Sequence, residues 1–232
     1  MLLSGHAEVT GGDSVETGFV VRVRHGAQSV VGVVGRPPAD AIARALDNIT
    51  DMTPLLAQVG NAEYIQRTLD GSRPERWSGE AAIMHALPAP DRTLHAPRPA
   101  PDADIRLLTS ADPLDHLPPG LRHEMTHARL LGPVGAAFAD GLPVSFCYPV
   151  WTTEALWDLS IDTVETHRRR SLAASAVAFM VDHMRRDGRE PVWGALASNT
   201  PSLRLAAKLG FAPVGQIVVF SKGQWAYLTG GF

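Results

Sequence analysis

The chain has 232 residues, of which 45% are apolar, and its formal net charge is −3. That length fits one large domain or two small ones with a proper hydrophobic core, and a nucleic-acid-binding protein would usually be basic, so we expect no nucleic-acid partner. The single cysteine, Cys147, excludes an intrachain disulfide. The N-terminus has no basic region followed by an apolar run, so we expect no signal peptide, and no apolar stretch approaches the length of a membrane span. We therefore expect a cytoplasmic protein with no membrane partner.

The first part of the chain is predicted to form a small α/β lobe. Two valine-rich runs flank a short polar turn and predict a β-hairpin, and Pro37-Pro38 is typical of a helix start. In chain order, the predicted elements are strands at 19–23 and 29–34, helices at 39–49 and 61–69, and a strand at 81–87. We find no catalytic constellation in this part.

A proline-rich stretch, residues 87–101, separates the first part of the chain from the second. It contains five prolines, which remove backbone donors and disfavour helix before them. We therefore divide the chain into an N-terminal α/β lobe, residues 1–101, and a second domain, residues 102–232.

The second part alternates strands and helices in a mixed α/β pattern, which predicts a mixed sheet. Asp140-Gly141 is typical of a tight hairpin turn, and Asp187-Gly188 is typical of a helix end. The predicted strands are 105–109, 134–138, 143–150, 155–164, 191–197 and 214–220, and the predicted helices are 121–131, 171–186 and 201–209.

The junction near residue 170 has the features of an anion site. A strand-like run ends near Val164, three arginines occupy 168–170, and a helix begins at Ser171. The first N–H groups of a helix have no partner within it and lie at the positive end of its dipole. Small residues there let a phosphate approach the backbone, and Ser171 can add a hydroxyl donor. An isolated run of arginines would more often be a solvated turn.

Two motifs carry a resemblance to a known family. Residues 168–173, RRRSLA, resemble the R/Q-x-x-G-x-G/A acyl-CoA signature of the GNAT N-acetyltransferase superfamily, with Ser171 where the family usually has glycine. Asn199-x-x-Ser202, followed by Leu205 and by KLGF at 208–211, resembles a later helix of the same family. The two motifs stand in the family's order and at its usual separation, and the resemblance covers residues 103–222.

The resemblance implies an acyl-CoA N-acyltransferase (GNAT-like) fold with an additional N-terminal α/β lobe, and acetyl-CoA as cosubstrate. It implies direct transfer of an acetyl group to a primary amine of a small-molecule or peptide acceptor, and it leaves a homodimer open. The residues that it places against acetyl-CoA are Ile161, Thr163 and Val164 on the strand, Arg168, Arg169, Arg170, Ser171, Leu172, Ala173 and Ala174 at the turn and helix start, and Asn199 and Ser202 at the later helix.

The acid–base residues are less clearly marked. The attacking amine must lose a proton, so a carboxylate or histidine near the thioester is expected. Asp158 and Asp162 share one face of their strand, and Asp162 is our candidate for a base or a substrate-binding anion. A carboxylate at this place more often simply pairs with an arginine, and that alternative stays open. The family's general-acid tyrosine directly follows the leucine that matches Leu205, and this chain has Ala206 there.

Two alternatives stay open. The segment His123–His127, HEMTH, matches H-E-x-x-H, in which two histidines on one helix face bind zinc and the glutamate is the base of a metallopeptidase. A short pattern arises readily by chance and a third ligand is not evident, so we expect no metal. The second alternative, a non-catalytic acyl-CoA-binding protein of the same fold, would explain Ala206. In a catalyst, Tyr148 or His167 is a candidate to replace the tyrosine.

Overall fold

A computed structural model describes residues 6–25, 28–50, 53–72, 76–88, 94–95 and 104–222, so most of the proline-rich stretch lies outside the described residues. The described strands form one eleven-stranded mixed sheet. In chain order the elements are β1 (His6–Gly11), β2 (Phe19–His25), β3 (Gln28–Val34), α1 (Ala39–Ala45), β4 (Leu55–Gln58), η1 (Val59–Asn61), α2 (Ala62–Ser72), β5 (Trp77–Ala86), β6 (Asp104–Leu107), α3 (Pro119–Leu131), β7 (Gly135–Ala139), β8 (Leu142–Thr152), β9 (Leu156–Thr163), η2 (Glu165–His167), α4 (Leu172–Arg186), β10 (Glu190–Leu196), α5 (Thr200–Lys208) and β11 (Ala212–Lys222).

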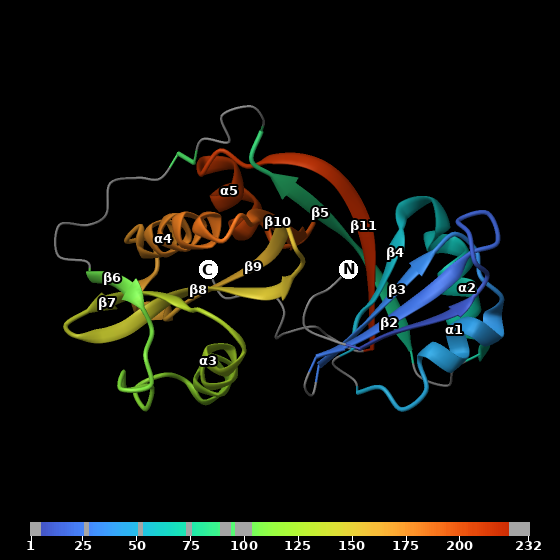
Figure 1. The fold of residues 1–232 in the computed structure, drawn as a ribbon, viewed down its shortest axis with the longest axis horizontal. Coiled ribbons are helices and arrows are strands. Elements are labelled where there is room, and N and C mark those ends of the chain that lie inside the picture. Colours follow the sequence, from blue (N-terminus) through green and yellow to red (C-terminus); the bar gives the residue numbers. More distant parts are fainter. Residues whose placement is uncertain are drawn as a thin grey trace.

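The sheet is continuous across the two parts expected from the sequence. Its strand order is β1-β2-β3-β4-β11-β5-β10-β9-β8-β7-β6. β5 of the first part pairs with β10 of the second, and β11 of the second part pairs with β4 of the first. β5 and β11 also pair with each other, and these two long strands join the two halves of the molecule (Figure 1). The boundary near residue 101 therefore divides the sequence but not the sheet, because β5 pairs with β10 of the second part and β11 pairs with β4 of the first.

The two halves repeat one pattern of elements. The series β1-β2-β3-α1-β4-α2-β5 corresponds to β7-β8-β9-α4-β10-α5-β11. In both series the first three strands are antiparallel neighbours, and the third and fourth are parallel neighbours. In both, the last strand lies antiparallel beside the fourth strand of the other half. β6 and α3 stand outside the repeat. The N-terminal lobe is thus topologically a second copy of the C-terminal half, with the last strands exchanged.

Helices cover both faces of the sheet in the C-terminal half. α4 and α5 lie on one face and α3 on the other (Figure 1). The residues that α4 buries against strands β8 to β10 include Ala176, Val177, Met180, Met184, Trp157, Ile161 and Trp193. A second cluster under α3 contains Met125, Phe146 and Tyr148. Burial of one large apolar side chain contributes about 1.5–3 kcal/mol, so these clusters fix α3 and α4 against the strands between them.

Most predicted elements of the second part are confirmed, with ends that differ by a few residues. Asp140 and Gly141 have positive φ angles of 51° and 77°, as a tight hairpin turn requires. The predicted helix at 39–49 ends earlier, at Ala45, and Asn48 adopts a left-handed φ of 56°. Strands β1 and β4 were not predicted. Within the described ranges, no helix is both long and apolar enough to cross a membrane.

Candidate functional site

The parallel strands β9 and β10 part from each other at their carboxyl ends. They pair at Leu156, Trp157 and Asp158 of β9, and the last pair is Asp158 with Val192. β9 continues to Thr163 and β10 to Leu196, but no register pair joins them beyond that point. Backbone N–H and C=O groups in the interior of a sheet need partners, so the open edge of β9 is suited to a ligand that supplies amide groups.

A strained turn connects the open end of β9 to helix α4. Arg168 donates from Nε to the carbonyl oxygen of Thr163 at 3.4 Å, which ties the turn to the strand end. Arg169 and Ser171 both have left-handed φ angles, 64° and 62°. Such angles are costly for residues other than glycine, which accounts for the glycine that the family has at the position of Ser171. Ser171 precedes α4 without capping it through its side chain, so the first N–H groups of the helix stay available.

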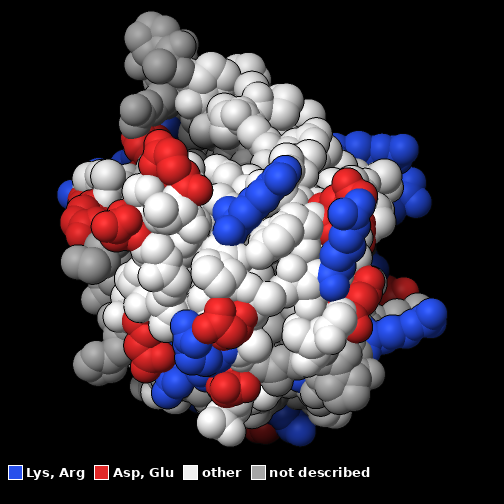
Figure 2. Space-filling model, turned by 90° about the vertical axis from the view of Figure 1, so that its right-hand side faces the viewer, with Lys and Arg blue, Asp and Glu red and all other residues white. Residues whose placement is uncertain are grey.

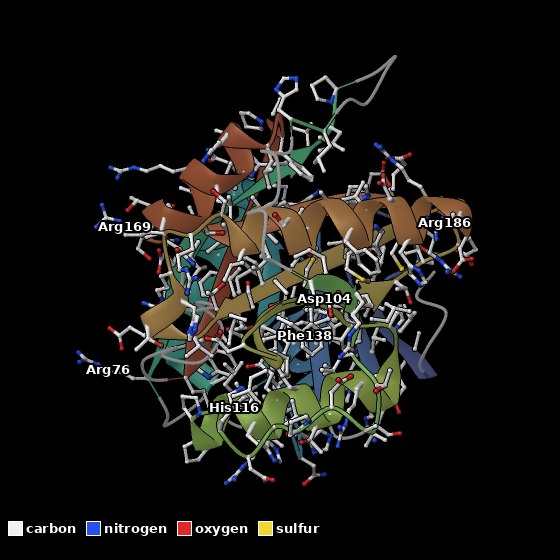
Figure 3. The ribbon with its side chains drawn as sticks, turned by 90° about the vertical axis from the view of Figure 1, so that its left-hand side faces the viewer. Arg76, Asp104, His116, Phe138, Arg169 and Arg186 are labelled. Carbon is white, nitrogen blue, oxygen red and sulfur yellow. The ribbon has the colours of Figure 1, made fainter. Side chains whose placement is uncertain are left out.

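A pocket of about 480 Å³ lies at the start of α4. One wall is the turn and first turn of α4, and the opposite wall is the α5 face that carries Pro201, Arg204, Leu205 and Lys208. Figure 3 shows Arg169 at one end of α4, far from Arg186 at the other end. Four arginine and lysine side chains line the pocket, and its described lining contains no aspartate or glutamate. The pocket is therefore electrostatically suited to an anion.

The structure brings most of the predicted cofactor residues together. Those that line the pocket are Thr163, Arg168, Arg169, Ser171, Leu172, Ala173 and Ala174. Ile161 buries its side chain in the core beneath α4, and it reaches the open edge of β9 through its backbone. Val164, Arg170, Asn199 and Ser202 are not among the lining residues. Arg204 and Lys208 line the pocket, although sequence reasoning gave them no role in binding the cofactor; their spacing of four residues on a helix was the available signal.

Asn199 and Ser202 have structural roles at α5. The Asn199 Oδ1 accepts from the backbone N–H of Ser202 at 3.2 Å and so caps the helix. The Ser202 hydroxyl accepts from the indole Nε1 of Trp193 at 2.9 Å, and both side chains are buried. The expectation that Ser202 faces the cofactor is corrected by this geometry, because its hydroxyl is directed into the core.

Replacing Ser202 with alanine should therefore destabilise the protein without weakening cofactor binding. The change leaves the buried Trp193 N–H without an acceptor, which we expect to lower the free energy of unfolding by about 1–3 kcal/mol. Urea unfolding followed by tryptophan fluorescence measures that loss, and calorimetric titration with acetyl-CoA measures the affinity. A weakened affinity in a protein of unchanged stability would restore Ser202 to the cofactor site.

A hydrogen-bonded cluster lies on the opposite face of the sheet, under α3. The Tyr148 hydroxyl is 2.6 Å from Oε1 of Glu124 and 2.9 Å from Oδ2 of Asp162. Burial raises the pKa of Glu124 to about 7, and the nearby charge of Asp162 adds to the rise. Burial and the charges of the two carboxylates also raise the pKa of Tyr148 well above its ordinary value, so the phenol stays protonated at neutral pH.

Asp158 lies where β9 and β10 begin to part. Asp158 is on the same face of β9 as Asp162. It also lies close to Gly194 of β10, because a side chain at that glycine would place its Cβ atom 3.9 Å from Oδ1 of Asp158. Burial raises the pKa of Asp158 to about 7, and a hydrogen bond from the Gly194 backbone opposes that rise. On the α3 side of the sheet, burial thus raises the pKa of both Glu124 and Asp158 to about 7, a value suited to a general base.

The HEMTH segment is on α3 but does not form a metal site among the described residues. The rings of His123 and His127 lie edge to face with centroids 4.6 Å apart, and both residues are exposed. Glu124 is turned the other way, toward Tyr148. No group of three or more histidine, cysteine, aspartate or glutamate side chains in the described residues is arranged to hold a metal ion. Among the residues that the structure describes, the zinc alternative therefore has no third ligand.

The N-terminal half does not repeat the cleft. β3 and β4 do not part as β9 and β10 do: their last pair, Val33 with Ala57, is one residue before the end of each strand. Arg36, which follows β3, donates from Nε to Asn61 Oδ1 at 3.3 Å, and the Tyr64 hydroxyl donates to the Pro37 carbonyl. These contacts close the region that corresponds to the anion pocket.

On the face shown in Figure 2, acidic and basic side chains are interspersed, without a large patch of one sign.

Comparison with known proteins agrees with this geometry. Residues 134–220 match the family model of GNAT acetyltransferases. No curated protein matches the chain. A GCN5-related N-acetyltransferase-like protein from Streptococcus suis superimposes with a TM-score of 0.65 at 14% identity, over 94% of this chain and 88% of that one. A GCN5-related N-acetyltransferase from Kribbella flavida gives a TM-score of 0.60 at 14% identity, over 97% and 91% of the two chains.

A third structure is similar over both halves of the chain. It is a tandem GNAT protein from the clavulanic acid biosynthesis pathway, with a TM-score of 0.54 at 14% identity, over 97% of this chain and 85% of that one. Identities this low show the fold alone, and that fold is the GNAT acetyltransferase fold. The family model matches residues 134–220, inside the C-terminal half, and the solved GCN5-related N-acetyltransferase structures share the fold of the chain.

Proposed function

We propose that the protein is an acetyl-CoA-dependent N-acetyltransferase that acts on a primary amine of a small-molecule or peptide acceptor. The observation that carries this proposal is the parting of β9 from β10 beside a pocket lined by basic side chains and the first turn of α4. The family match supports the reaction class, and the geometry supports one cofactor site, in the C-terminal half.

The residues present suit two parts of coenzyme A, its pyrophosphate and its pantetheine arm. The N–H groups of Leu172 to Ala174, with Arg168 and Arg169, suit a pyrophosphate. The open edge of β9 from residue 159 to 163 offers backbone groups to the amides of a pantetheine arm. When bound, acetyl-CoA supplies an activated acyl group, and the chain then needs only to orient an amine and to move its proton.

Asp162 is the proton acceptor in this proposal. Its carboxylate and that of Glu124 share one tyrosine hydroxyl, which has a single proton to donate. Two ionised carboxylates on one hydroxyl repel each other, so the cluster holds an additional proton until the pH rises through about 7, the pKa of Glu124. Asp162 receives the proton of the amine. The Tyr148 hydroxyl gives its proton to the leaving thiolate and takes a proton back from Asp162 across their hydrogen bond, so the net transfer is from the amine to the thiolate. Tyr148 thereby takes the part of the tyrosine that Ala206 replaces.

Titration with acetyl-CoA tests the cofactor assignment. A ligand that binds only the folded protein stabilises it, by about 2.7 kcal/mol when its concentration is 100 times Kd. We expect acetyl-CoA and CoA to raise the melting temperature, and adenosine monophosphate at the same concentration to raise it much less. No rise with millimolar acetyl-CoA would contradict the proposal.

Turnover separates an enzyme from a non-catalytic acyl-CoA-binding protein, the alternative that the buried Ala206 favours. Acetyl transfer to a panel of amines releases free CoA, whose thiol is measured with a chromogenic disulfide. Cys147 is fully buried and does not add to that signal. We expect release that depends on the amine. Tight binding without release for any amine would favour the non-catalytic alternative.

A further inference from the structure

Helix α5 presents a pair of basic side chains to the pocket. Arg204 and Lys208 are four residues apart on the same helix face, which places them about 6 Å apart along the helix axis. Both line the pocket whose other wall is the start of α4. The pocket therefore has two separate groups of cations, one at the phosphate turn of α4 and one on α5.

The α5 pair has no counter-charge in the described part of the chain. Neither side chain forms an ion pair with a described residue, and no aspartate or glutamate lines the pocket beside them. Like charges four residues apart destabilise a helix slightly. Lys208 lies in the last helical turn, where the dipole favours a cation, but Arg204 lies a full turn earlier and has no such explanation. An anion bound between the two side chains would remove their repulsion.

We propose that Arg204 and Lys208 bind the 3′-phosphate of coenzyme A and make the protein select CoA over its 3′-dephospho form. This inference rests on the proposed cofactor site. The α4 N-terminus and its arginines account for the pyrophosphate, which leaves the pair on the opposite wall for a second phosphate. A phosphate monoester carries about −1.5 to −2 charges at pH 7, which suits two cations held side by side.

The test compares CoA with 3′-dephospho-CoA by calorimetric titration of the full chain. We expect the wild-type protein to bind CoA about 10- to 50-fold more tightly. In Arg204→Gln/Lys208→Gln the ratio should fall to within about twofold, because the lost contacts serve only the 3′-phosphate. Both substituted residues are exposed, so we expect the variant to fold, as its melting temperature without ligand would verify.

Arg186→Gln is the matched control. It removes the same charge from an exposed position at the far end of α4, and we expect it to leave the ratio unchanged (Figure 3). Equal wild-type affinity for the two ligands, or equal weakening of both in the double variant, would overturn the 3′-phosphate assignment while leaving the cofactor site in place. Failure of the wild-type protein to bind either ligand would instead overturn the proposed function and this inference with it.

Discussion

Replacing Ser171 with glutamate should reduce the affinity for acetyl-CoA by at least about 100-fold, which corresponds to about 2.7 kcal/mol. Ser171 stands immediately before α4 and lines the pocket with the helix start. A carboxylate there would face the pyrophosphate at short range, in a site that otherwise attracts anions through helix N–H groups and arginines. Calorimetric titration at low salt measures the loss.

Ser171→Gly is the matched control for that experiment. The left-handed φ of 62° at Ser171 is unstrained for glycine, so this variant should keep the wild-type affinity within about threefold. We expect its free energy of unfolding to rise by about 0.5–1 kcal/mol, since relief of strain exceeds the added freedom of the unfolded chain. If the glutamate variant binds acetyl-CoA as tightly as the glycine variant does, the anion site is not at this turn.

Replacing Asp162 with asparagine should lower kcat by about 100-fold or more and leave the Kd for acetyl-CoA within about threefold. Asparagine keeps the shape of the side chain and an acceptor for the Tyr148 hydroxyl, but it cannot take a proton from an amine. Rates at saturating amine, together with titration of the cofactor, separate the two effects. An unaltered kcat would remove Asp162 as the base.

The pH dependence of the wild-type rate tests the cluster as a unit. Burial and the neighbouring charge of Asp162 raise the pKa of Glu124 to about 7, so below that pH the cluster already holds the proton that it would have to accept. Activity should therefore fall as the pH drops through about 7 and be full near pH 8. In Glu124→Gln the repulsion between the carboxylates is gone, and the fall should move about one unit or more toward acid pH. An unchanged profile would assign the titration elsewhere.

Asp158 provides the comparison for that profile. Its pKa is raised to about 7 by burial, at the point where β9 and β10 part. If Asp158→Asn moves the acid limb and Glu124→Gln does not, the base lies at the parting point of the strands and the Tyr148 cluster is structural. The pH at which activity falls should therefore shift in only one of the two variants, and that variant identifies the carboxyl group that titrates.

Sequence alone was enough to predict most elements of the C-terminal half and the basic turn before α4. The apolar period of α4, the Asp-Gly hairpin turn and the glycines that follow α4 and α5 are local signals, because they reflect backbone angles and the spacing of buried residues. The approach of Arg168, Ser171 and Ala173 to one pocket follows from their place at one helix start, so their spacing was enough to predict it. β4 is only four residues long, and its sequence, LLAQ, does not alternate between apolar and polar residues although its burial does, so it carried no comparable signal.

Tertiary structure alone decided which distant residues meet. The exchange of β5 and β11 depends on pairing between strands more than a hundred residues apart, which no local pattern encodes. Glu124 was visible only as part of a zinc-like motif, and its contact with Tyr148 and Asp162 arises because α3 packs on that face of β8 and β9. Ser202 has a motif position but a buried partner in Trp193. The sequence thus predicted most helices and strands and the basic turn before α4, whereas the packing of α3 and α5 against the sheet decided which side chains complete the site.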